Sequence, residues 1–398
     1  MSKSNETTPN VPTLRFPNYS SEWQVSPMGK VCTFRKGYGI SKDNLSSDGT
    51  PCILYGELYT TYKTAIAKNI KSKTSLDPTI LFHSKKNDVI IPCSGETAED
   101  IATSVCIPYD DILLGGDLTV IRSDLDGAFL SNQINSVRKY DIARIAQGKS
   151  IVHLQADELK KISIAYPTID EQQKISGFID QIDERIEVQN KIISKYETLI
   201  KGLSCDYFSK QPNHIAKLKD LIIKGKAGGT PSSTIAEYYN GNIPFLSISD
   251  MTRQGKYVEF TEKHISENGL ANSSAWIVPS NSLILSMYAS VGLVCINKVP
   301  LATSQAMFSM VLKDCNMLDY IYYYLNFFRE TQIHRLLETG TQSNINADTV
   351  RDIEIPFYSN ILVFVKTLQA IENRLNNEKD MLSRLMDLKT YLLSSLFI

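Results

Sequence analysis

Apolar side chains recur in alternating steps of four and three residues over two long stretches of the chain, residues 175–207 and 364–396. The second stretch repeats the first 189 positions later, and eight of the ten aligned positions are hydrophobic in both. This alternation is the seven-residue repeat of a coiled-coil seam, so it predicts two long helices. We assign to the seam Ile179, Ile182, Ile186, Ile193, Leu203, Leu368, Ile371, Leu375, Leu382 and Leu392.

The polar position inside the first seam recurs as well, because Gln189 aligns with Glu378. Two unrelated apolar helices would not need to share such a position, so we expect a shared register. Each helix has one apolar face and must bury it against another helix, and its own copy is the nearest candidate. We predict antiparallel pairing, and a helix of roughly 40 residues would span about 60 Å. An ordinary helical hairpin is the structural alternative.

The repeat continues outside the helices. At an offset of 191, Ala156 and Asp157 align with Ala347 and Asp348, and further upstream Asn87 matches Asn281. Two long copies are too few for a solenoid and indicate internal pseudo-twofold symmetry. Short runs rich in β-branched residues precede each helix, at residues 51–55, 88–92, 118–122, 244–248 and 282–286. The sequence thus predicts strands, and in each half a globular domain that ends in strand, turn and long helix. Thr168 and Glu171 predict a capping box at the first helix.

Composition is that of an ordinary globular protein with room for two cores: 398 residues, 42% hydrophobic and 21% charged. No stretch reaches 18 uninterrupted apolar residues, and residues 1–11 lack the apolar segment of a signal peptide, so we expect a cytoplasmic protein without a membrane partner. Seven scattered cysteines without a CxxC pair argue against a zinc site or a disulfide framework, and we expect buried thiols.

The net charge of −1 gives no hint of a nucleic-acid partner, but its distribution does. Residues 30–86 hold ten basic and four acidic residues with interleaved tyrosines, whereas residues 217–263 hold seven basic and five acidic ones. Cations with interleaved aromatic residues are typical of DNA-binding surfaces. A solvated lysine-rich face is an equally good interpretation of charge alone.

Motifs that carry chemistry are missing from the sequence. We find no P-loop, no GxGxxG after a strand, no HExxH, and no nuclease-type cluster of carboxylates and lysine. The five histidines stand singly, without the spacing of metal ligands. Gly228–Ser232 is glycine-rich but lacks the lysine of a phosphate loop, so a tight turn is expected. A contact of its amides with a DNA backbone is the alternative.

Several motifs, in their order, resemble the specificity subunits of type I restriction-modification enzymes. In the second half these are Gly228–Ser232, Ser286–Gly292, Ala302–Ala306 and Gly340–Asp348, and in the first half Gly37–Lys42, Cys93–Gly95, Gly115–Thr119 and Pro167–Gln173. The resemblance covers essentially the whole chain after its N-terminal tail, and the order of the motifs is more specific than any one of them. Phe357–Asn360 departs from the helix start of the first repeat, which leaves the start of the second helix open.

The resemblance implies an α+β fold with two mixed α/β target recognition domains in tandem, each followed by a long helix, the two helices pairing as an antiparallel coiled coil. The expected boundaries are residues 1–20 for an N-terminal tail, 21–167 for the first recognition domain, 168–210 for the central spacer helix, 211–356 for the second recognition domain, and 357–398 for the C-terminal spacer helix.

The function that this resemblance implies is sequence-specific DNA binding. Two recognition domains would each read one half of a bipartite double-stranded target, and the helix pair would fix the separation of the halves, since sites about 34 Å apart share one face of B-DNA. Two methyltransferase subunits would bind along the helices and bring S-adenosylmethionine, and restriction subunits would add ATP and magnesium chemistry. The chain itself would hold no cofactor or metal and would catalyse nothing.

Polar and basic side chains near expected loops are the candidate DNA contacts. An arginine that binds guanine bidentately contributes about 1 to 3 kcal/mol of discrimination, whereas a lysine on phosphate affects all sequences alike, so Arg253→Ala tests the first role. The candidates are Arg35, Lys36, Tyr38, Lys42, Tyr59, Tyr62, Lys63, Lys226, Thr230, Ser232, Arg253, Lys256 and Tyr288.

Two other functions remain open at this point. A scaffolding protein, with a dimerising coiled coil and two β-rich protein-binding domains, explains the neutral charge but not why a repeated scaffold carries different surfaces. A stand-alone DNA methyltransferase is disfavoured, because the sequence has no Asn- or Asp-Pro-Pro-aromatic motif and no glycine-rich cofactor loop.

Overall fold

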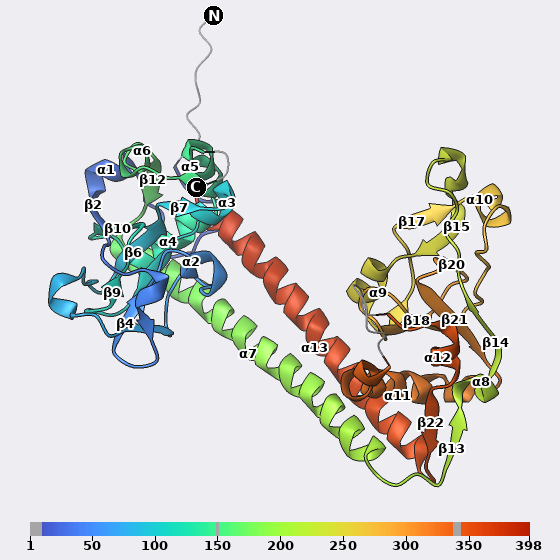
Figure 1. The fold of residues 1–398 in the computed structure, drawn as a ribbon. Coiled ribbons are helices and arrows are strands. Elements are labelled where there is room, and N and C mark those ends of the chain that lie inside the picture. The colour runs from blue at the N-terminus through green and yellow to red at the C-terminus, as the bar shows by residue number, and fades with distance from the viewer. Residues whose placement is uncertain (1–9, 149–150, 337–343) are drawn as a thin grey trace, which may run out of the picture. The chain divides into compact units, whose positions relative to one another are not determined.

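The computed structural model describes residues 10–148, 151–336 and 344–398 (Figure 1). These residues form two compact units, each with its own cores. Unit 1 comprises residues 1–192 and 378–398, and unit 2 comprises residues 193–377. Unit 1 is therefore built from two separate parts of the sequence, whereas unit 2 is continuous.

The main sheet of unit 1 is antiparallel and has the strand order β2 (Cys32–Lys36), β10 (Leu118–Ser123), β6 (Asp88–Pro92), β8 (Val105–Ile107). Alternate residues of its strands enter two different cores, as period-two alternation requires. Val89 and Ile91 pack with helices α4 (Gly127–Asn135) and α5 (Lys139–Ile145). Ile90 packs with a second sheet, β3 (Leu45–Ser46), β5 (Ser72–Thr74), β4 (Thr50–Ile53), β9 (Leu113–Leu114).

Unit 2 repeats these layers. Its main sheet has the order β14 (Ile222–Ala227), β21 (Met307–Leu312), β18 (Leu283–Ser286), β19 (Val294–Asn297), β16 (Tyr257–Val258). Leu283 and Leu285 pack with helix α11 (Leu318–Thr331), and Ile284 enters the core on the other face, where α9 (Ile248–Gln254) contributes Met251. A smaller sheet follows, β17 (Lys263–Ile265), β15 (Tyr239–Leu246), β20 (Ala302–Thr303).

Smaller elements also occur in corresponding pairs. Strand β1 (Gln24–Pro27) pairs with β12 (Ser163–Tyr166), as β13 (His214–Lys217) pairs with β22 (Glu354–Phe357). The short helices are α1 (Met28–Val31), α2 (Glu57–Thr60), α3 (Ala98–Ile101) and α6 (Ala156–Leu159) in unit 1, and α8 (Leu218–Leu221), α10 (Glu267–Ala271) and α12 (Ala347–Arg351) in unit 2. A short ladder joins β7 (Ser94–Gly95) to β11 (Val152–His153).

The two halves share individual backbone conformations. Asn87 and Asn281, aligned by the sequence, are both left-handed, with φ of 78° and 58°. Asparagine tolerates this region better than most residues. Each donates its backbone N–H across the sheet, Asn87 to Ile107 O at 2.8 Å and Asn281 to Asn297 O at 2.7 Å. The predicted tandem repeat of mixed α/β domains is confirmed.

The two predicted long helices are α7 (Ile169–Phe208) and α13 (Ile361–Ser395). In unit 1 the early part of α7 meets the late part of α13: Asp183 pairs with Lys389 at 2.5 Å, and Gln189 Nε2 donates to Glu378 O at 3.0 Å. In unit 2 Tyr207, late in α7, stacks on Phe364, early in α13, at 3.8 Å between ring centroids. The antiparallel pairing is therefore confirmed.

The seam residues lie as follows in the two units. Six of the ten are buried, and Ile186, Leu203, Ile371 and Leu382 are half-buried. The start of the second helix, open in the sequence, is Ile361. At the start of α7 the carboxylate of Glu171 makes a bidentate salt bridge with Arg15, at 2.7 and 2.8 Å, rather than serving a capping box with Thr168.

The cysteines are free thiols, five of them buried, with Cys205 half-buried and Cys315 exposed. Burial raises the pKa of Cys52 to about 11 and that of Cys106 to about 12. Within the described ranges, no helix has the length and apolar character that crossing a membrane requires.

Candidate nucleic-acid interface

The first strand of each main sheet leads into a glycine-containing segment, and the same backbone hydrogen bonds hold this segment in both units. In unit 1, Gly37 N donates to Leu118 O at 2.9 Å and Tyr38 N to Leu114 O at 3.0 Å. The corresponding bonds of unit 2 run from Gly228 N to Met307 O at 3.2 Å and from Gly229 N to Thr303 O at 2.9 Å. The glycine motifs of the two halves therefore occupy equivalent places.

Each of these segments has a glycine because a neighbouring backbone segment passes too close for a side chain. A Cβ atom on Gly37 would lie 2.3 Å from the carbonyl oxygen of Gly115, and one on Gly228 would lie 1.9 Å from that of Thr303. Either contact is far inside van der Waals distance, so glycine is required there. Residues 228–232 form an irregular segment, and turn conformation is assigned only to the two residues that follow, 233–234, so the tight turn expected within Gly228–Ser232 is not found there.

In each unit, two further loops lie beside the glycine-containing segment. The loop after β6 is tied by Cys93 N to Asp117 O at 2.7 Å, and the loop after β18 by Met287 N to Ala306 O at 2.8 Å. Gly116 N also donates to Ile40 O at 3.3 Å. We call these segments the rim loops: residues 37–42, 93–95 and 115–117 in unit 1, and residues 228–232, 287–290 and 304–306 in unit 2. Each rim combines a fixed backbone with exposed side chains at some positions, while residues 93–95 are buried.

Eight of the thirteen candidate residues lie on the rim loops or on the strand that leads into them. Tyr38 is 59% exposed and Tyr288 42% exposed. Thr230 donates its hydroxyl to Gln305 Oε1 at 2.5 Å. The remaining members of this group are all exposed: Arg35, Lys36, Lys42, Lys226 and Ser232.

Arg35 and Lys226 occupy the same place in their sheets. Arg35 on β2 faces Val120 on β10, and Lys226 on β14 faces Ser309 on β21. Both side chains are exposed at an edge strand, two residues before the glycine of the following segment. The two units thus share a cation at this position, whereas the residues that follow the glycine, up to Lys42 in unit 1 and Ser232 in unit 2, differ.

Three candidates of the first domain lie elsewhere, in and after α2. Tyr62 is only 8% exposed and belongs to the core between the two sheets, where burial raises the pKa of its hydroxyl. Lys63 donates to Tyr59 O at 3.0 Å. All three line a hollow of about 340 Å³ that α13 borders through Lys389. Tyr62 is withdrawn as a base contact because its ring packs in the core.

Arg253 is withdrawn as a guanine-binding residue. Its guanidinium lies 3.1 Å from the buried carboxylate of Asp250, also pairs with Glu262, and covers the ring of Phe260. Each terminal nitrogen of the guanidinium is already held by a carboxylate, so a bidentate contact with a base edge would have to break these salt bridges.

Lys256 is withdrawn for a related reason. Its side chain is 10% exposed and its ammonium lies 2.8 Å from Asp319 and 2.7 Å from Glu372. Burial disfavours the charged form, but these carboxylates hold the pKa of Lys256 above its ordinary value. The lysine is therefore a charged internal group and cannot meet phosphate.

Two residues near the second rim were missed by the sequence analysis. Lys224 is exposed on the same face of β14 as Lys226, and its ammonium lies 4.1 Å from the ring centre of Trp276. The alternation Lys224-Gly225-Lys226 within a strand was the signal that could have indicated it. Gln305, the partner of Thr230, had no signal beyond its place in a resemblance motif.

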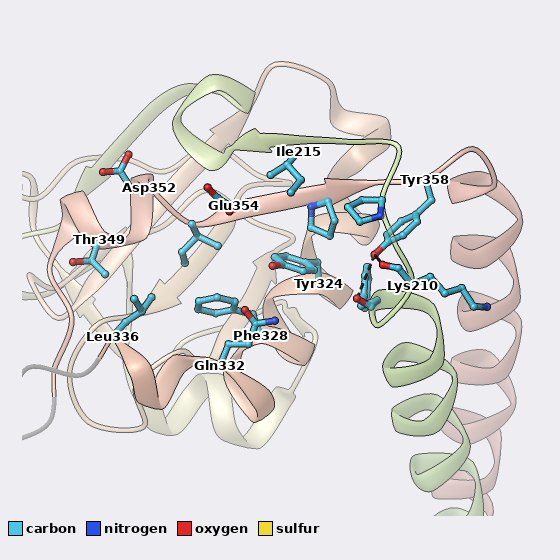
Figure 2. A pocket seen from close by; sticks show the side chains of 14 residues that line it. Lys210, Ile215, Tyr324, Phe328, Gln332, Leu336, Thr349, Asp352, Glu354 and Tyr358 are labelled. Atoms are coloured by element: carbon cyan, nitrogen blue, oxygen red, sulfur yellow. Dashed lines mark hydrogen bonds between the residues drawn. The ribbon is translucent and has the colours of Figure 1, made fainter.

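A separate hollow of about 550 Å³ lies in unit 2 beside β13 and β22, as Figure 2 shows. Tyr324 and Phe328 line it, and the hydroxyl of Tyr358 donates to Lys210 O at 3.2 Å. Its carboxylate Asp352 is bridged by Lys217 and Lys219, which lower its pKa. None of the residues that line this hollow belongs to the rim loops.

No group of three or more His, Cys, Asp and Glu side chains among the described residues is placed to hold a metal ion. The motif Gly340–Asp348 can be followed only in part, because residues 340–343 lie outside the described ranges. Ile345, within that motif, donates its N–H to Met287 O at 3.1 Å, which places this part of it at the second rim.

Comparison with known proteins identifies relatives of this arrangement. The model of the type I restriction modification DNA specificity domain matches residues 20–198 and 212–379. The specificity subunit of the type I restriction enzyme MjaIX from Methanocaldococcus jannaschii is 30% identical over 147 residues, 36% of this chain and 34% of that protein. The HindI specificity subunit from Haemophilus influenzae is 31% identical over 180 residues, 43% of this chain and 38% of that protein. Each alignment thus spans little more than a third of the relative's length.

Solved structures share the fold. A crystal structure of a type I restriction-modification system S subunit from M. genitalium has a TM-score of 0.63 at 16% identity, covering 98% of this chain and 99% of that chain. A chain from a structure on complex assembly and conformational transition of the type I R-M system has a TM-score of 0.58 at 16% identity, covering 94% of this chain and 97% of that chain. With the family model matched over both repeats, the protein belongs to the family of type I restriction modification DNA specificity domains.

Proposed function

We propose that this protein is the DNA-reading subunit of a type I restriction-modification complex and that each rim reads one half of a bipartite duplex target. The paired rims carry this proposal: the same backbone hydrogen bonds recur in both units, while the exposed side chains on them differ. A reader of two unlike half-sites needs a repeated support with different contacts. A scaffold with two protein-binding domains gives no reason for this combination, and family membership does not favour it.

Within each rim, we assign two roles. Arg35 and Lys226, equivalent in position and alike in charge, hold phosphates and set the placement of each domain on the duplex. Tyr38, Lys42, Thr230, Ser232 and Tyr288, which differ between the rims, contact base edges. Lys36 adds charge at the first rim.

The chemistry belongs to other subunits in this proposal. Two methyltransferase subunits bind along the long helices and modify adenine with S-adenosylmethionine, and restriction subunits join through the complex. The chain itself acts as a non-catalytic reader in the cytoplasm, with α7 and α13 as the spacer between half-sites.

Co-expression of the chain with its methyltransferase subunit tests the function. The complex is purified, and host DNA is sequenced with a method that reports N6-methyladenine. A split motif that is methylated only when this chain is present is the expected result. Absence of any new methylation, with a methyltransferase shown to be active beside another specificity subunit, would refute the proposal.

Rim variants separate the two roles. Thr230→Ala with Tyr288→Ala should change the motif only in the half-site read by unit 2, and Tyr38→Ala only in the other half. Arg35→Gln and Lys226→Gln should each weaken binding to all sequences alike and reduce the salt slope by about 1. The exposed Lys263, away from the rim, provides the charge-matched control as Lys263→Gln.

A further inference from the structure

In each unit, a lysine of the globular domain makes salt bridges with the long helix that follows that domain. In unit 1, the ammonium of Lys68 lies 2.7 Å from Asp180 and 2.7 Å from Glu184, both on α7. The backbone of Lys68 is held in turn, because the hydroxyl of Tyr109 donates to its carbonyl at 2.8 Å. We call this arrangement the first clamp.

Unit 2 makes the corresponding contact with Lys256, the second clamp. Its ammonium meets Glu372 on α13 at 2.7 Å and Asp319 on α11 at 2.8 Å, and a hydrogen bond joins it to the hydroxyl of Tyr323 at 2.8 Å. The rings of Tyr257 and Tyr322 lie within 5.2 and 5.1 Å of the ammonium. This clamp is buried, whereas the side chain of Lys68 is 38% exposed.

The two lysines lie on equivalent segments of the two units, but at different positions within those segments. Ala65 O accepts from Cys106 N at 2.7 Å, just as Lys256 O accepts from Ile296 N at 2.7 Å. Lys256 therefore corresponds to Ala65, and Lys68 follows three residues later on the same segment. The two halves make the same domain-to-helix contact with residues that do not align, which indicates that the contact itself is what matters.

One carboxylate of each clamp lies at the same distance from the start of its helix, although the shared seam register aligns Glu372 with Asp183, and Glu184, the second partner of Lys68, lies further along α7. Asp180 lies eleven residues beyond Ile169, the first residue of α7, and Glu372 lies eleven residues beyond Ile361, the first residue of α13. At 1.5 Å per residue this is about 16 Å along the helix. Each domain is joined covalently to its helix at the first residue. The clamp is a directional attachment further along the helix, beside the hydrogen bonds from Asp126 N to Gln172 Oε1 at 2.9 Å and from Gln369 Nε2 to Asp319 Oδ2 at 2.6 Å.

We propose that the two lysine clamps fix the angle at which each recognition domain stands on its helix and thereby restrict the number of base pairs allowed between the half-sites. This inference rests on the proposed function. Apolar packing alone is non-directional and tolerates rocking about the covalent joint. One base pair corresponds to about 3.4 Å along the duplex, so a modest rotation of a domain moves its rim by one base-pair step.

The test uses the complex with the methyltransferase subunit and a series of duplexes in which the two half-sites are kept and the spacer is shortened or lengthened by one base pair. The variants are Lys68→Met and Lys256→Met. Because Lys256→Met leaves Asp319 and Glu372 without their cation, the combination K256M/D319N/E372Q removes all three charges and keeps the fold measurable. Exposed lysines of the same domains serve as controls, as Lys71→Met and Lys263→Met.

We expect the clamp variants to raise the rate of methylation on off-length duplexes, relative to the natural spacer, by about tenfold. The half-site sequences stay the same, and both controls keep the original spacer preference. The triple variant should raise the relative methylation rate on off-length duplexes more than Lys68→Met does, because the second clamp is largely buried and the first is partly hydrated. A clamp with only a stabilising role would lower yield or melting temperature without changing spacer preference.

Unchanged spacer preference in folded, active Lys68→Met and triple-variant complexes overturns the inference, and so does a change in half-site sequence. Failure of the unaltered complex to methylate any split motif overturns the proposed function, and the inference with it. The two failures are thus told apart by the unaltered complex.

Discussion

Removal of the Arg15 side chain should destabilise unit 1 while leaving unit 2 unchanged. Arg15 binds Glu171 through two parallel bonds of 2.7 and 2.8 Å, and the carboxylate of Glu171 is completely buried. Arg15→Ala therefore leaves a buried negative charge without a partner. The residue lies outside every recognition rim, so the effect is one of folding rather than DNA contact.

The size of the expected stability loss follows from the burial of the Glu171 carboxylate. Two unit charges roughly 4 Å apart attract by about 4 kcal/mol at an effective dielectric of about 20. Breaking a buried pair costs about 3 to 5 kcal/mol. Glu171 is the third residue of α7, where the helix dipole offsets up to about 1 kcal/mol. We expect a loss of about 3 kcal/mol, which shifts the urea midpoint of unit 1 by about 1.5 M for a slope of about 2 kcal/mol/M.

Tryptophan placement supplies the assay. Trp23 is 2% exposed in unit 1 and packs on Phe129 with ring centroids 5.6 Å apart, and Trp276 belongs to unit 2. With Trp276→Phe as background, fluorescence during urea unfolding reports unit 1, and with Trp23→Phe it reports unit 2. The matched control is Arg185→Ala, an exposed arginine on α7, which should change stability by less than about 0.5 kcal/mol.

A double substitution tests the reasoning about charge. R15M/E171L removes both charges together, and replacing a buried ion pair by apolar residues is commonly neutral or stabilising. It should therefore recover most of the stability lost in Arg15→Ala. A double variant as unstable as Arg15→Ala, or a single variant that shifts the midpoint no more than Arg185→Ala, would refute the account.

Two further predictions use the same fluorescence assay. Gly37→Ala should destabilise unit 1 by about 1 to 3 kcal/mol, because its Cβ would lie 2.3 Å from a carbonyl oxygen. Gly116→Ala, with nothing within 4 Å, should be neutral, and equal effects would contradict the steric explanation. Burial favours the neutral form of Asp319, but Lys256 outweighs it and lowers the pKa of that carboxyl. Its contribution is present above the unfolded pKa of about 3.9 and lost as pH falls through the lower folded pKa, so Asp319→Asn should flatten the loss of unit 2 stability in this window.

The features that could be predicted from the sequence are those that depend on local periodicity or on the tandem repeat. The seam at Ile179 and Leu392 follows from a seven-residue repeat, and the match of Asn87 with Asn281 follows from the tandem copy, because both are properties of neighbouring residues or of alignment. The irregular backbone at Gly228 was expected from its glycines, although the turn itself lies further on, at residues 233–234. Such features need no knowledge of tertiary contacts.

Partners far apart in sequence explain the rest. Lys256 was interpreted as a free cation, but its partner Glu372 lies 116 residues away. Arg253 was interpreted in the same way, and its partners Asp250 and Glu262 lie only three and nine residues away but contact it only in the folded segment. Arg15 fell within a segment assigned to a tail, and its partner Glu171 lies 156 residues further on. Charge patterns along a chain cannot distinguish a surface cation from one already paired.

The discontinuity of unit 1 has a consequence for synthesis on the ribosome. Trp23, Ile175 and Ile179 share a core with Leu396 and Phe397, which are translated more than 200 residues after Ile179. Unit 2 is continuous and can fold as soon as residues 193–377 have emerged. At about 5 to 20 residues per second, the first domain waits roughly 10 to 40 s for its last segment. The domain whose translation begins first is therefore completed after the second, and a chain that stops before Leu392 lacks part of the core that holds Trp23.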